Sequence, residues 1–91
     1  MNPTEYEDRE LLVKLIDYID GLLGTCRDDL HELNAIGRHL RRAKENGRLS
    51  DMHYTVDQER LQRTLHKCKQ IMVTLLTQRK RAETMLKELQ T

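Results

Sequence analysis

The sequence predicts an all-α protein built as an antiparallel helical hairpin of two long helices. Apolar residues recur at alternating steps of four and three along two stretches, an Asn-Gly pair lies between them, and the composition is typical of helices. Phe and Trp are absent, Tyr occurs three times and Pro once. Because 91 residues leave room for one domain, we expect residues 1–91 to form a single helical domain with a thin core.

The first helix is expected over about residues 5–46. Thr4 and Glu7 have the spacing of a capping box, in which the Thr hydroxyl and the Glu side chain each accept a hydrogen bond from a backbone amide of the first turn. The apolar positions that follow keep one heptad phase. They form the first seam: Leu12, Ile16, Ile19, Leu23, Cys26, Leu30, Leu33, Gly37 and Leu40.

Two glycines, Gly21 and Gly24, leave open whether this stretch is one helix or two. Gly24 could end a helix and Thr25, with Asp28 three residues later, could begin another, which would give a compact three-helix bundle. The heptad rhythm continues unbroken through Gly21 and Gly24, however, so we expect a kink near Gly21 to Thr25 and keep the bundle as the alternative.

The turn is expected over 46–54 and the second helix over about 55–90. Asn46 and Gly47 suit the end of a helix, and Thr55 with Gln58 repeats the capping-box spacing. Arg79 alone places a charge in the second seam, where the fold brings it opposite the turn that holds Asp17 and Asp20. The second seam comprises Leu61, Leu65, Cys68, Met72, Leu75, Arg79, Ala82, Leu86 and Leu89.

Charge and hydropathy narrow the function classes. Charged residues make up 34% of the chain, but the net charge is only +1, so the whole molecule is not expected to attract nucleic acid or an anionic membrane. The polar start and the charges within 11–23 predict neither a signal peptide nor a membrane span. We therefore expect a cytoplasmic protein with reduced cysteines and no membrane partner.

No residue pattern indicates catalysis, a cofactor or a metal. Cys26 and Cys68 lie in the seams, near His31 and His66, but no pair of ligands has the close spacing of structural zinc sites. Buried reduced cysteines are common small core residues. The histidines have no Ser or Cys partner at triad spacing, and no Gly-rich phosphate loop is present. The prediction is that the protein is not an enzyme.

One segment resembles an enzyme family. The run 16–20, Ile-Asp-Tyr-Ile-Asp, followed by Leu22-Leu23 and Ile36-Gly37, resembles the opening helix of the small all-helical chorismate mutases. The resemblance covers about 25 residues and implies an entwined homodimer that binds a dicarboxylate through several cations. Near those cation positions this chain has Val13 or Lys14 and Leu30 or His31, and 55–59 lacks the Arg of the family pattern. A chorismate-mutase-like enzyme is therefore the most distant alternative.

Apolar residues beyond the seams predict an interaction surface. A second stripe runs beside the first seam, and further apolar residues lie outside the second seam. Because such patches mark association surfaces, we expect a helical protein–protein interaction module, such as an adaptor, an assembly subunit or an export-chaperone-like protein, which pairs as a homodimer or with a helical partner. The predicted surface comprises Leu11, Leu15, Tyr18, Leu22, Ile71, Val73, Leu76 and Met85.

The alternative function is binding of nucleic acid or another polyanion at the turn. Arginines gather there on both sides of the connection and could contact phosphates, although no aromatic residue is placed to stack a base. The candidate contacts are Arg38, Arg41, Arg42, Arg48, Arg60 and Arg63.

Overall fold

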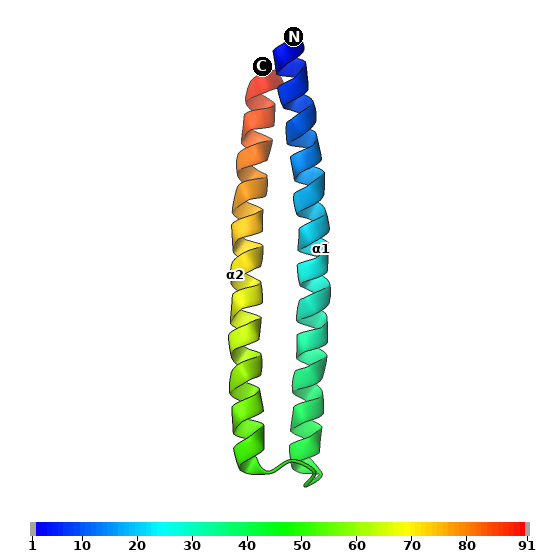
Figure 1. The fold of residues 1–91 in the computed structure, drawn as a ribbon, viewed down its shortest axis with the longest axis vertical. Coiled ribbons are helices and arrows are strands. Elements are labelled where there is room, and N and C mark those ends of the chain that lie inside the picture. The colour runs from blue at the N-terminus through cyan, green and yellow to red at the C-terminus, as the bar shows by residue number, and fades with distance from the viewer. Residues whose placement is uncertain (1, 91) are drawn as a thin grey trace. The chain divides into compact units, whose positions relative to one another are not determined.

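The computed structural model describes residues 2–90 and confirms an all-α chain of two long helices (Figure 1). Helix α1 spans Pro3–Glu45 and helix α2 spans Asp51–Gln90. The packed residues fall into two compact units. The terminal unit contains the described residues of Met1–Thr25 and Met72–Thr91, and the turn unit is Cys26–Ile71. Within each unit, a segment of α1 lies antiparallel to a segment of α2. That the whole chain forms one domain stays a prediction.

Burial confirms the heptad phase of both helices. Every residue of the two predicted seams is buried or half-buried. The core of the terminal unit is formed by Ile19, Leu23, Leu75 and Ala82, and the most buried side chains of the turn unit are those of Leu61 and Leu65. The seams form because a four-three spacing keeps one stripe of each helix facing the other.

Both helices begin earlier than the sequence suggested, because different residues cap them. Asn2 caps α1: the Glu5 amide donates to Asn2 Oδ1 at 2.8 Å, and Asn2 Nδ2 donates to Glu5 Oε1 at 3.4 Å. Ser50 caps α2 by accepting a hydrogen bond from the His53 amide at 3.2 Å. Thr4 and Thr55 therefore lie inside helices, and the hydroxyl of Thr55 donates to the carbonyl of Asp51 at 2.9 Å. Helix α1 thus begins two residues before the predicted start near residue 5, and α2 begins four residues before the predicted start near residue 55.

The connection is correspondingly shorter than the predicted 46–54 and spans only 46–50. Gly47 has φ of 71°, and its amide donates to the carbonyl of Lys44 at 3.1 Å, while the Arg48 amide donates to the carbonyl of Ala43 at 2.8 Å. These two bonds form a Schellman motif, which needs a left-handed residue such as glycine after the helix. The Lys44 ammonium lies 4.5 Å from the centre of the Tyr54 ring and links the two helices beside the turn.

The alternative three-helix bundle is wrong, because α1 continues through Gly21 and Gly24 without a break. Thr25 does not cap a new helix; its hydroxyl donates back to the carbonyl of Gly21 at 3.3 Å. The predicted kink in this segment stays a prediction. Gly37, in the turn unit, lies close to α2, since a Cβ added there would be 3.1 Å from Leu61 Cδ2.

Candidate interaction surface

Few apolar side chains are buried in this chain, and many are exposed. Among the described residues, six apolar side chains form the core, while thirteen large apolar side chains are exposed. Exposure of this extent is typical of a surface that a partner covers. All eight residues of the predicted interaction surface are among the exposed ones.

The most regular exposed stripe lies on α1 in the terminal unit. Leu11, Leu15, Tyr18 and Leu22 are 64%, 45%, 66% and 36% exposed. Each residue directly precedes a residue of the first seam, so all four lie on the same flank of that seam. Their steps of four, three and four repeat the seam spacing, and α1 therefore carries a second stripe on which another helix can pack.

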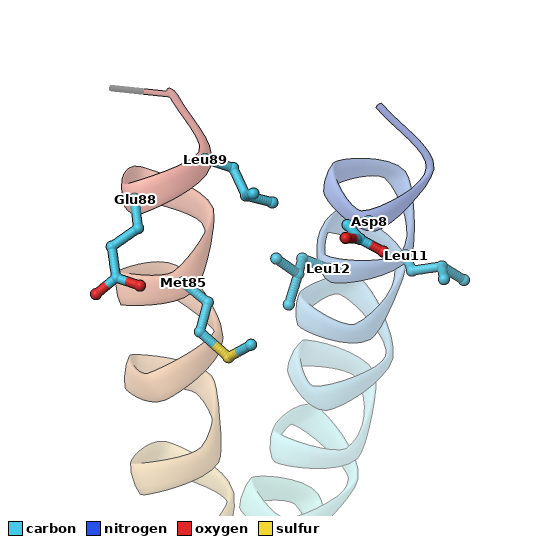
Figure 2. Close-up of a pocket in the computed structure, with 6 residues that line it drawn as sticks. All are labelled: Asp8, Leu11, Leu12, Met85, Glu88 and Leu89. Atoms are coloured by element: carbon cyan, nitrogen blue, oxygen red, sulfur yellow. The ribbon is translucent and has the colours of Figure 1, made fainter. Parts of the chain in front are cut away.

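A groove lies on the same side of the terminal unit. It has a volume of about 430 Å³ and is lined by Asp8, Leu11, Leu12, Met85, Glu88 and Leu89. Figure 2 shows Leu12 and Leu89 turned toward each other between the helices, with Met85 beside them, while Leu11 and Glu88 point outward. The groove has an apolar floor and a carboxylate from each helix at its edge. We call this side of the terminal unit, which carries Leu11, Leu15, Tyr18, Leu22 and Met85, the leucine face.

The remaining predicted residues, Ile71, Val73 and Leu76, lie away from the leucine face. Val73 and Leu76 each follow a residue of the second seam, and in an antiparallel pair they lie on the side opposite the leucine face. Asp20 and Glu83 occupy that opposite side, which we call the charged face. Ile71 belongs to the turn unit. Seven of the eight residues thus fall in the terminal unit, divided between two faces.

Arg79 connects the seam to the charged face. Its Nε donates to Asp20 Oδ1 at 2.6 Å and its Nη2 to Asp20 Oδ2 at 3.3 Å, and Nη1 pairs with Glu83. The hydrogen bond to Asp20 raises the pKa of Arg79. The predicted position of Arg79, opposite the helical turn of α1 that holds Asp20, is confirmed. The fork geometry of guanidinium and carboxylate fixes how the two helices align in this unit.

The two cysteines lie in the turn unit beside a second groove of about 320 Å³, which Ile36, Lys67 and Ile71 also line. Cys68 Sγ donates to the backbone carbonyl of Cys26 at 3.6 Å, and both residues are half-buried free thiols. Burial, followed by the nearby Cys26 and Asp29, raises the pKa of the Cys68 thiol. The sequence placed both thiols in the seams, but it did not show that they adjoin a groove.

One of the described histidines lies close to a serine hydroxyl. His53 Nδ1 lies 3.0 Å from Ser50 Oγ, but this pair belongs to the cap of α2. Among residues 2–90, no group of three or more His, Cys, Asp or Glu could hold a metal ion. Of the positions suggested by the chorismate mutase resemblance, Lys14 pairs with Glu10 at 3.5 Å and His31 is exposed.

The arginines of the turn unit do not converge on one surface. Arg38 and Arg41 line a groove of about 310 Å³ with Asn34, Gln58 and Gln62. Helical periodicity directs Arg60 to the opposite flank of the helix pair, while Arg42 and Arg63 lie on the backs of their helices. Arg48 lies in the connection. All six are exposed, and Arg38 and Arg41 line one groove.

Within residues 2–90, neither helix is long and apolar enough to cross a membrane. Comparison with known proteins found no protein family, curated protein or solved structure that matches this chain.

Proposed function

We propose that the chain is a helical interaction module that binds a partner helix along the leucine face of its terminal unit. The observation that carries this proposal is the second stripe of α1, whose four members keep seam spacing and are all exposed. A helix seam of this kind is stabilised when a second helix covers it. The charged face is a weaker candidate, because Arg79 already pairs with Asp20 and Glu83 there.

The adjacent groove favours a helix as the partner. An amphipathic helix binds through apolar side chains one turn apart, which enter hydrophobic grooves between helices. The groove floor of Leu12, Met85 and Leu89 supplies such a site next to Leu11. Adaptor, assembly subunit and export chaperone are all roles that a binding site of this kind can serve, and no membrane surface enters the proposal.

The energetic contribution of the stripe is large enough to measure. Burying a leucine or a larger apolar side chain contributes about 1.5 kcal/mol or more, so loss of two such contacts weakens binding about 100-fold. The double substitution Leu15→Gln and Tyr18→Gln removes two stripe residues that are 45% and 66% exposed in the chain alone. Since neither is in the core, the helix content should be retained.

The test compares the size of the assembly that contains the chain in native cell extract, by gel filtration under mild conditions. The Leu15→Gln, Tyr18→Gln chain should elute as a smaller species than the unchanged chain. The matched control is Val73→Gln with Leu76→Gln, at 63% and 48% exposure on the charged face, and it should leave the elution volume unchanged. Equal behaviour of the two variants, or a chain that elutes as a monomer throughout, would overturn the proposal.

A further inference from the structure

We infer that the partner helix is α1 of a second copy of this chain, packed antiparallel on the leucine face of the terminal unit. This inference rests on the proposed function and specifies its partner. It places Leu11 opposite Leu22 of the second copy and Leu15 opposite Tyr18 of the second copy, so that a twofold axis passes between Leu15 and Tyr18.

The spacing of the stripe is self-complementary. Steps of four, three and four read the same in both directions, so an antiparallel copy meets each stripe residue with another one. In a twofold interface every contact occurs twice, because residue i meets j wherever j meets i. A parallel arrangement would also align the stripe, but it would bring Leu11 of the second copy to the level of the groove, and Leu11 lies on the side of the stripe farther from the seam.

The position of the groove selects the antiparallel arrangement. On α1 the groove is lined by Asp8, Leu11 and Leu12, so its centre is near the level of Leu11. The twofold axis brings Leu22 of the second copy to that level. Leu22 lies on the side of the stripe nearer to the seam, as does Leu15, and its side chain therefore leans toward the groove floor of Leu12, Met85 and Leu89.

The composition of the α2 half of the leucine face explains why α1 pairs with α1. Apart from Met85, the α2 residues on the leucine face are polar, so an α1 stripe placed over α2 would bury leucines against polar groups. Only α1 of the second copy offers a continuous apolar counterpart. The polar residues of α2 then form the rim of the interface, as is usual at association surfaces: Thr74, Gln78, Arg81 and Glu88.

The available area suits a stable dimer. The α1 segment of the terminal unit has a length of about 35 Å, and two helices side by side are about 20 Å wide, so the face covers about 700 Å², close to the roughly 800 Å² per partner of a standard interface. A second copy covers this area without any segment from outside the described chain.

Disulfide capture distinguishes this arrangement from its rivals. In a background with Cys26→Ala and Cys68→Ala, one chain carries Leu11→Cys and another carries Leu22→Cys, and the two are mixed with oxidised glutathione. Residues 11 and 22 are about 16 Å apart along one helix, whereas disulfide-linked Cα atoms lie about 4.4–6.8 Å apart. Mixed dimers should therefore exceed dimers of either single chain at least tenfold. A chain with Val73→Cys on the charged face serves as the matched control and should remain uncoupled.

The contrary outcomes separate this inference from the proposed function. Dimers of the Leu11→Cys chain with itself would indicate parallel helices and overturn the antiparallel arrangement, while the leucine face would remain the binding site. Absence of every cross-link, together with a monomeric mass for the purified native chain, would exclude a second copy as the partner. In that case the native-extract comparison still tests the proposed function: a response to Leu15→Gln with Tyr18→Gln would support a different helix as the partner, and no response would overturn both.

Discussion

Replacement of Gly24 by alanine should stabilise the chain, and the sign of this change tests the course of α1. In the structure Gly24 lies inside a continuous helix, and a Cβ added there would meet no atom within 4 Å apart from its chain neighbours and the nearby backbone of its own helix. Alanine in a helix interior is more favourable than glycine by about 1 kcal/mol, because the unfolded glycine has more backbone freedom to lose. The free energy of unfolding should rise by about that amount, which corresponds to about 4–8 °C in Tm for a domain of this size.

The measurement is urea unfolding followed by circular dichroism at a fixed protein concentration. Gly47→Ala provides the opposite control, since Gly47 has φ of 71° and alanine in the left-handed region costs about 1–2 kcal/mol. If the chain reversed direction at Gly24, that glycine would cap a helix with positive φ, and Gly24→Ala would destabilise the chain as Gly47→Ala does. A loss of stability in Gly24→Ala would therefore refute a continuous α1.

Three further predictions concern side chains outside the leucine face. Arg79→Leu should leave the thermal stability unchanged or raise it, but the chain should then populate more than one association state, because the ion pair fixes the alignment of the helices more than it stabilises them. Thermal melting and sedimentation velocity test this, and a sharp loss of stability with a single remaining species would contradict it. Near pH 9.0, Cys68 of the folded chain should react more slowly with iodoacetamide than Cys68 of the unfolded chain, because the raised pKa keeps the folded thiol protonated; equal rates would argue against burial. As the pH rises through 9.0, the unfolded chain loses this proton first, so the folded state loses stability. Any affinity for nucleic acid should fall steeply with salt, and Arg41→Gln should weaken all sequences alike; no binding in filter assays at about 50 mM salt would remove this function.

The heptad pattern contained most of the information on the fold. Its phase alone identified all eighteen seam positions, because burial along a helix pair follows side-chain direction, which the period determines. The helix starts were mispredicted because several residues competed as caps. Thr4 and Thr55 have suitable spacing, but Asn2 and Ser50 are stronger caps and begin the helices earlier, which lengthens the helices at their N-terminal ends.

The candidate surface was predicted less well, because distance along a helix is easier to infer than direction around it. Along the helix axis, Val73 and Leu76 lie at the level of the α1 stripe, as predicted. Each directly follows a residue of the second seam, however, whereas Met85 directly precedes a residue of that seam. This difference of side separates them from the leucine face. The groove could not be derived from the sequence, since it depends on how far Leu12 and Leu89 fill the space between the helix ends.

Sedimentation equilibrium of the purified native chain, over a wide range of concentrations, tests the central claim most directly. A leucine face that pairs with itself predicts a mass twice that of one chain, with dissociation only on dilution. Leu15→Gln with Tyr18→Gln should shift this equilibrium toward the monomer about 100-fold or more, and Val73→Gln with Leu76→Gln should not. A native chain that remains monomeric and fully helical at the highest concentration would contradict self-association through this face.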